Sequence, residues 1–257
     1  INSPGGSPAA AQETRHVHAK VIIALPRITK EREQKVIESY LRTSHALRPD
    51  GFLLSHLGSL EMVRAASDLP IYANYPFHFF NTYNRKIFEK QNIAGFTLSP
   101  ELKKGEIFAL IDQEEFGHLE IELLVFGALE LMVSQFCPVG AWAGKVAPKS
   151  CPRPCQQSRY FLRDRKEIDF PAVVDEYCRL HLLNSRYLSL LPELETLKEK
   201  NLSLRLELRH QSPELAAKVI NIFQKGLASG GRDLDQSALA AILDQGLTKG
   251  HFYRGVE

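Results

Sequence analysis

The chain has 257 residues, of which 44% are hydrophobic and 24% are charged, which is ordinary for a soluble globular protein with one large core or two modest ones. The net charge of +2 gives no general argument for nucleic acid, membrane or acidic substrate, and no run of 18 apolar residues is present to span a membrane. Four cysteines are too few for a disulfide-rich secreted scaffold, and no signal peptide begins the chain, so we expect a cytoplasmic protein.

The first 18 residues are expected to form a flexible linker. The chain starts with Ile1 rather than Met, and the run NSPGGSPAAAQ at 2–12 consists mainly of small residues. We therefore expect a piece of a longer polypeptide or a subunit trimmed at its front. Its partners would then include the missing N-terminal part of the same polypeptide or another subunit.

Residues 19–136 alternate short apolar strands with amphipathic helices. A first helix is expected after Thr29, and the other elements are strands at 20–25, 51–56, 71–75, 95–99 and 121–126 and helices at 59–67, 77–91 and 103–113. This rhythm indicates βαβ units, a parallel sheet and right-handed crossovers. The predicted class is α/β, with a partial or complete TIM-barrel-like domain. Since five units do not complete an eight-stranded barrel, we expect a half-barrel or an open sheet.

The rhythm changes near residue 128, and residues 137–257 are predicted to form a cysteine-rich metal-binding segment followed by a small α+β region. RYFLRD and IDFPAVVDE flank the polar run RKE and indicate a β-hairpin. A helix is expected to begin at Asn184 or Ser185, with an apolar stripe of Leu188, Leu191, Leu194 and Leu197. Strict alternation predicts a strand at 203–209, and helices are expected at 213–228 and 234–245.

The four cysteines have the spacing Cys-x13-Cys-x3-Cys-x22-Cys, and they are Cys137, Cys151, Cys155 and Cys178. Thiolates from irregular backbone, stiffened by neighbouring prolines, suit an iron–sulfur cluster. Structural zinc is the alternative metal, although neither close pair has the usual Cys-x2-Cys spacing. A third interpretation is four unrelated buried thiols.

Asn74, Asn81 and Glu122 are the candidate catalytic residues. Asn74 lies in an apolar strand, where an amide must be hydrogen-bonded, and polar groups at the carboxyl ends of barrel strands commonly face the active site. Glu122 lies in IELLVF, where a carboxylate is costly unless it is paired or poised for chemistry. The alternatives are a satisfied core or turn asparagine and an outward-facing strand start.

Six further residues are candidates for substrate binding. Arg27 could clamp a carboxylate or phosphate, or lie exposed on the surface. Ser99 and Glu101 flank Pro100 at a strand-to-helix junction, where Ser99 could instead cap the helix. The tail residues His251, Tyr253 and Arg254 lie between glycines and could bind nucleic acid or close over a site, or pack on the domain.

Several separated segments resemble one family, the collagenase-like peptidases or U32 peptidase family. They are LPRI at 25–28, GFLLSHLGSL at 51–60, IYANYPFHFFN at 71–81, GFTLSPEL at 95–102, ELLVFGALELMVSQFCPVG at 122–140, FLRDRKEIDFPAVVDEYC, LLNS at 182–185 and the closing TKGHFYRGV. The cysteines resemble those of the branch found in long, multi-domain members, of which this chain would be the C-terminal portion. The resemblance implies a TIM-barrel-like catalytic domain and a 4Fe-4S cluster held by the four cysteines.

The same resemblance implies two different activities. Its better understood relatives hydroxylate RNA pyrimidines or a quinone precursor without oxygen, and prephenate is implicated as oxygen donor for the RNA enzymes. The family name implies a peptidase, yet the sequence has neither a nucleophile elbow nor HExxH. We therefore expect a cluster-dependent hydroxylase acting on RNA or a small aromatic substrate. The alternatives are a peptidase and a non-catalytic, metal-stabilised scaffold that binds RNA or a partner subunit.

Overall fold

A computed structural model of the chain describes residues 19–112, 119–144, 151–229 and 236–255. The linker predicted at 1–18 lies outside the described residues. The chain forms two compact units, which we describe separately. We call residues 19–124, 200–205 and 250–255 the parallel unit, and residues 125–199 and 206–249 the cysteine unit.

The parallel unit contains a parallel sheet in which neighbours along the chain are neighbours in space. Its strands follow one another in the order β1 (Ile22–Ala24), β2 (Gly51–Leu54), β3 (Ile71–Ala73), β4 (Gly95–Thr97) and the start of β5 (Glu120–Ser134). Thr97 pairs with Glu122 in the register between β4 and β5. This topology confirms the predicted α/β class and the βα units of a partial barrel.

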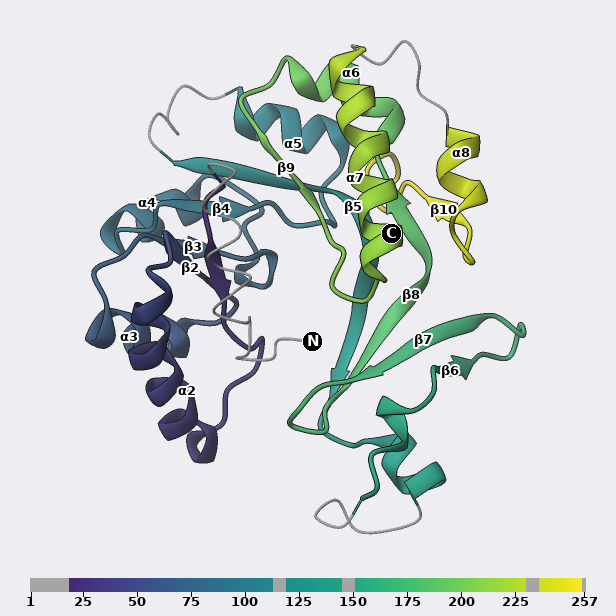
Figure 1. Cartoon of the computed structure of the whole chain (residues 1–257). Coiled ribbons are helices and arrows are strands. Elements are labelled where there is room, and N and C mark those ends of the chain that lie inside the picture. The colour runs from purple at the N-terminus through teal and green to yellow at the C-terminus, as the bar shows by residue number, and fades with distance from the viewer. Residues whose placement is uncertain (1–18, 113–118, 145–150, 230–235, 256–257) are drawn as a thin grey trace. The chain divides into compact units, whose positions relative to one another are not determined.

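Helices connect these strands (Figure 1). They are α2 (Glu31–Ser44), α3 (Leu57–Ala66), α4 (Tyr83–Lys90) and α5 (Lys104–Ile111), with short 3-10 turns at His45–Leu47 and Tyr75–Phe77. The helix predicted at 77–91 is wrong in its first half, because His78 adopts a left-handed conformation (φ 54°) that ends the 3-10 turn. The helix begins only at Tyr83.

An aromatic cluster fixes α4 on the sheet. The rings of Phe79 and Phe96 stack with their centroids 3.8 Å apart, and Phe88 lies 5.4 Å from Phe79. All three side chains are buried, so the cluster excludes water between the helix and β4.

The cysteine unit contains an antiparallel arrangement. The remainder of β5 pairs with β8 (Leu180–Ser189), β8 pairs with β7 (Asp169–Val174), and β7 pairs with β6 (Tyr160–Arg163). Figure 1 shows β7 and β8 running from the turn that joins them. The predicted hairpin over RYFLRD and IDFPAVVDE is therefore confirmed. β10 (Leu247–Thr248) adds to β8 in parallel. β9 (Ser203–Leu206), whose first three residues belong to the parallel unit, pairs with β5.

Helix α7 (Pro213–Ala228) confirms the prediction at 213–228 and contributes Phe223 to the core of the cysteine unit. Phe126 packs edge-on against Phe223 and stacks on Tyr187, with centroids 5.7 Å apart in both pairs. The remaining elements are α6 (Leu194–Lys198), α8 (Gln236–Ala241) and the 3-10 turn Leu191–Glu193. No helix in the described part of the chain has the length and apolar character needed to cross a membrane.

The helix predicted from Asn184 or Ser185 is wrong. Residues 180–189 form the central strand β8, and helix α6 begins only at Leu194. Strands β5 and β7 provide backbone partners to β8, and Pro192 has no amide hydrogen with which to continue a helix through its position. Leu188 is buried within the strand, while Leu191, Leu194 and Leu197 are buried in the following turn and short helix.

Candidate functional site

The four cysteine thiols lie close together in the cysteine unit. A Cβ atom added at Gly140 would lie 3.4 Å from the Sγ atom of Cys137 and 3.5 Å from that of Cys151. Burial and then the charges of the other three thiols raise the pKa of Cys155. Burial and the neighbouring thiols, Cys137 and Cys151 among them, likewise raise the pKa of Cys178. Residues spread over three sequence segments thus form one group of thiols.

Irregular backbone presents each of these thiols. Cys137 precedes a π-helical turn at Gly140–Gly144, and Cys155 lies in a 3-10 turn at Pro154–Gln156. Cys178 lies in the turn between β7 and β8 with a positive φ of 60°. Such turns allow side chains from distant segments to point toward one centre.

The surroundings of the thiols fit a metal–thiolate centre. The Gly140 amide donates a hydrogen bond to Cys137 Sγ at 3.2 Å. A Cβ at Gly144 would lie only 3.0 Å from Cys151 Sγ, so a larger residue would crowd that sulfur. Four thiolates with amide donors are the ligand set of iron–sulfur clusters and of structural zinc. Among the described residues, no three His, Cys, Asp or Glu side chains converge closely enough to hold a single metal ion.

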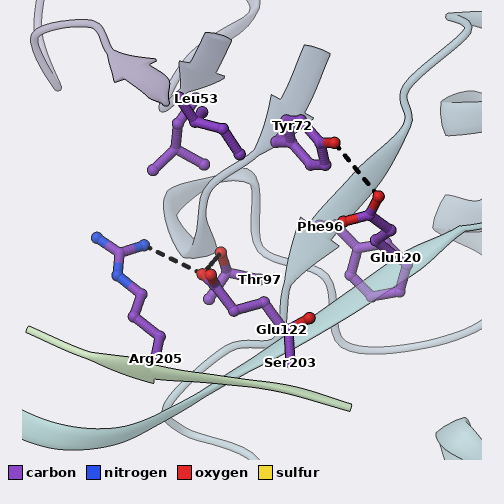
Figure 2. A pocket seen from close by; sticks show the side chains of 9 residues that line it. Leu53, Tyr72, Phe96, Thr97, Glu120, Glu122, Ser203 and Arg205 are labelled. Atoms are coloured by element: carbon purple, nitrogen blue, oxygen red, sulfur yellow. Dashed lines mark hydrogen bonds and ion pairs between the residues drawn. The ribbon is translucent and has the colours of Figure 1, made fainter. Parts of the chain in front are cut away.

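A second site is a pocket of about 320 Å³ in the parallel unit (Figure 2). Strands β1 to β5 form one side of it, and β9 contributes residues from a distant part of the sequence. Its lining combines apolar, hydroxyl, carboxylate and guanidinium groups, from Ile22, Leu53, Tyr72, Phe96, Thr97, Glu120, Glu122, Ser203 and Arg205.

Glu122 is the centre of a hydrogen-bond network in this pocket. Thr97, which is buried, donates from its hydroxyl to Glu122 Oε1 at 2.8 Å, and Arg205 Nη1 lies 3.4 Å from the same oxygen. Figure 2 shows both contacts converging on this carboxylate. Two donors on one oxygen fix the orientation of the carboxylate.

Asn74 extends the same network. Its Oδ1 accepts hydrogen bonds from Arg205 Nη1 at 3.0 Å and from the Tyr75 amide at 2.9 Å. Its Nδ2 donates to the Ser55 hydroxyl at 3.1 Å. Asn74 therefore caps the 3-10 turn at Tyr75 and also holds Arg205, so its structural and functional interpretations are compatible.

A second carboxylate of the pocket, that of Glu120, lies two residues before Glu122 at the start of β5. Glu120 Oε1 accepts from the Tyr72 hydroxyl at 3.4 Å and from Lys20 Nζ at 3.3 Å. Burial, followed by the charge of Glu120, raises the pKa of Tyr72, so its hydroxyl remains a donor at neutral pH. The pocket thus offers both donors and acceptors.

The other predicted strand and loop residues have contacts of their own. Asn81 is exposed, and its Oδ1 accepts from the Tyr83 amide at 3.0 Å at the start of α4. Arg27 is half-buried with its guanidinium 5.8 Å from the centre of the Tyr75 ring. Ser99 is buried and accepts from the amide of Glu101, as a turn-capping serine does, and Glu101 itself is exposed.

The tail residues His251, Tyr253 and Arg254 lie in a closing turn that contacts α5. His251 Nδ1 lies 2.7 Å from the carbonyl oxygen of Gly255, and the carbonyl of the buried Phe252 accepts from the Lys104 amide at 2.6 Å. Tyr253 and Arg254 are exposed. In this geometry the tail packs on the parallel unit.

Arg205, Thr97 and Tyr72 were not among the residues singled out from the sequence. The strand SLRLELR was recognised from its alternation, and Ser203 and Arg205 share its polar face. The polar residues on one face of this strand are the sequence signal that could have identified Arg205. Asn74, which accepts a hydrogen bond from Arg205, is 131 positions away in the sequence, and no local pattern predicts this contact.

The model of peptidase family U32 matches residues 7–255. No curated protein matches the chain. One similar solved structure is that of a protein assigned as the copper homeostasis protein CutC from Streptococcus agalactiae, with 17% sequence identity and a TM-score of 0.38. That likeness covers 48% of this chain and 70% of the other.

Proposed function

Because the chain belongs to peptidase family U32, we propose that it is an enzyme that uses an iron–sulfur cluster to hydroxylate an aromatic or pyrimidine ring without molecular oxygen. The observation that supports this most is the convergence of four cysteine thiols from three segments of the cysteine unit. Family membership alone does not identify the reaction. A group of four cysteine thiols can hold an iron–sulfur cluster, which favours redox chemistry.

Cys137, Cys151, Cys155 and Cys178 would hold a 4Fe-4S cluster, and such a cluster supplies one-electron redox chemistry when bound. A single zinc ion binds thiolates at about 2.3 Å, so its sulfurs stand about 3.8 Å apart. In a cluster, iron and sulfide separate the thiolates further.

The pocket in the parallel unit is the proposed site for the substrate ring. Leu53 and Phe96 supply apolar walls, and the carboxylates of Glu120 and Glu122 accept hydrogen bonds. A pyrimidine or substituted aromatic ring has the same combination of apolar faces and polar edges. For RNA, the base would have to be unstacked from its neighbours to enter.

Glu122 has the geometry of a group that orients a substrate or holds a proton. Thr97 and Arg205 fix its Oε1, and Asn74 holds Arg205 in turn. We assign Glu122 the proton-handling role and give Asn74 and Arg205 the role of positioning it.

The test uses anaerobically purified protein with its metal, incubated with RNA or small aromatic substrates and with prephenate as the proposed oxygen donor. Mass spectrometry should detect the gain of one oxygen atom. Cys155→Ser should abolish both cluster and product, and Glu122→Gln should lower turnover about 100-fold with the cluster retained. Glu61→Gln is the matched control, since Glu61 is 79% exposed on α3. Unchanged cluster content and activity in Cys155→Ser would refute the proposal.

The family description favours a second candidate, cleavage of collagen-like or other protein substrates. Iron-replete protein incubated with gelatin and peptide libraries tests it directly. Cleavage that disappears in Glu122→Ala would support a peptidase. Cleavage no greater than that of the Glu122→Ala protein would rule it out, and salt-dependent RNA binding without any turnover would favour the scaffold.

A further inference from the structure

The turn that carries Cys178 is held by one carboxylate. Asp175 Oδ1 accepts from the amides of Tyr177 at 2.9 Å and Arg179 at 2.7 Å. The backbone carbonyl of Asp175 accepts from the Cys178 amide at 3.0 Å, and its amide donates to the Arg179 carbonyl. Cys178 has a positive φ, which a residue other than glycine adopts only when its surroundings impose it. These four hydrogen bonds impose it here.

The second oxygen of Asp175 connects the turn to β8. Asp175 Oδ2 lies 3.4 Å from His181 Nε2 and 3.6 Å from a guanidinium nitrogen of Arg179. The side chain of Arg179 is 4% exposed, and its guanidinium lies 4.7 Å from the centre of the Tyr177 ring. The carboxylate is therefore fixed through both of its oxygens.

The other ring nitrogen of His181 contacts a carboxylate on a different strand. His181 Nδ1 lies 2.5 Å from Glu130 Oε2, and the Glu130 side chain is 6% exposed. The imidazole thus lies between two carboxylates, one in the turn and one on β5. The imidazole therefore links the turn that carries Cys178 to strand β5.

An irregularity in β5 makes the contact with Glu130. His181 pairs with Val133, so in a regular strand Glu130, three positions away, would point to the opposite face. Register shifts on both sides of Glu130 pair it with Leu183 instead. Because His181 and Leu183 share a face of β8, the bulge brings Glu130 to the face of His181.

We propose that Asp175, His181 and Glu130 form a positioning network that holds the Cys178 thiol in place as a ligand of the metal centre. The inference rests on the proposed function, since it takes Cys178 to be a ligand. Hydrogen-bonded groups outside the ligand set orient ligands in many metal sites, and their loss typically weakens metal binding about 10- to 100-fold. Asp175, His181 and Glu130 are placed to act on Cys178 in this way.

The test compares the reconstituted protein with Asp175→Asn, Asp175→Ala and His181→Gln. Iron and sulfide content, the visible spectrum, the spectrum of the reduced cluster by electron paramagnetic resonance, and the rate of cluster loss to a chelator are measured for each. Asp175→Asn keeps an acceptor for the turn but removes the negative charge that faces His181, whereas Asp175→Ala removes both the acceptor and the charge. Asp169→Asn is the matched control, because Asp169 lies on β7 before this turn and pairs with Arg163 of β6 where both side chains are exposed.

We expect Asp175→Asn and His181→Gln to lose the cluster about 10-fold faster than the wild type and to show an altered spectrum when reduced, with Asp175→Ala more severely affected. Asp169→Asn should match the wild type. If Asp175→Ala does not fold, the two milder variants decide the outcome. Wild-type spectra and loss rates in both would overturn the inference alone. A wild-type protein that takes up no iron and sulfide would overturn the proposed function and this inference with it.

Discussion

The pair formed by Glu122 and Arg205 should couple energetically beyond the level of a surface ion pair. The perturbation is a double-mutant cycle of Arg205→Met, Glu122→Gln and the double variant, followed by urea unfolding. Glu122→Gln keeps the size of the side chain and an oxygen that can accept from Thr97, and Arg205→Met keeps an unbranched side chain without the charge. The cycle therefore isolates the interaction between the two charges.

The expected magnitude follows from the geometry. At 3.4 Å and an effective dielectric constant near 20, the gross attraction is about 5 kcal/mol, and most of it cancels against the loss of hydration. The side chains are 15% and 34% exposed, so the pair lies between a surface pair and a buried one. We expect a coupling of about 1–2 kcal/mol, above the ~0.2–1 kcal/mol of exposed pairs.

The assay is the free energy of unfolding from circular dichroism in urea, measured for the wild type and the three variants. Arg159 and Asp244 supply the control cycle, because their side chains are 76% and 57% exposed at a separation of 3.4 Å. That pair should couple by less than about 0.5 kcal/mol. A Glu122–Arg205 coupling below about 0.5 kcal/mol would refute the view that the pocket holds its carboxylate in a fixed position.

Three further predictions concern single positions. Asn74→Ala removes three side-chain hydrogen bonds and should lower the free energy of unfolding by about 2–3 kcal/mol. Asn81→Ala removes one exposed hydrogen bond and should lower it by less than about 1 kcal/mol. Equal losses of the two variants in urea titrations would contradict the assigned roles. Burial lowers the pKa of His210 to about 4 from 6.5, so the unfolded chain binds a proton that the folded chain does not, and stability should fall by about 3 kcal/mol between pH 6.5 and pH 4. His210→Gln should flatten that part of the pH profile, and an unchanged slope would show that His210 is not the cause. Gly127→Ala should lower the free energy of unfolding by at least about 2 kcal/mol, because Gly127 has a φ of 138° and an added Cβ would lie 2.5 Å from Glu207 Cβ. Gly105 lies on α5 with open space around it, so Gly105→Ala should be neutral or stabilising. A melting-temperature shift of the same sign in both variants would argue against strain at Gly127.

The sequence was sufficient to predict the elements whose side-chain pattern agrees with their surroundings. The apolar runs at 51–56 and 95–99 are strands, and the alternating run at 203–209 contains β9. The prediction failed where long-range pairing overrides local periodicity. Leu188, Leu191, Leu194 and Leu197 have helical spacing, yet Leu188 lies in β8, where β5 and β10 provide backbone partners on its two sides.

The candidate site was predictable only in part for a similar reason. Asn74 and Asn81 both follow the apolar strand β3, and only the geometry shows that Asn74 contacts Arg205 while Asn81 accepts from the turn before α4. The grouping of Cys178 with cysteines more than 20 residues away was expected from chemistry. The carboxylate and imidazole that hold its turn were not, because a one-residue bulge decides which face Glu130 occupies.

Iron, acid-labile sulfide and zinc analysis of anaerobically purified protein, with a visible absorption spectrum, tests the central claim most directly. The four converging thiols predict about four irons and four sulfides per chain and a brown chromophore. Zinc without sulfide, or no bound metal after reconstitution, would contradict the cluster and the hydroxylase that depends on it.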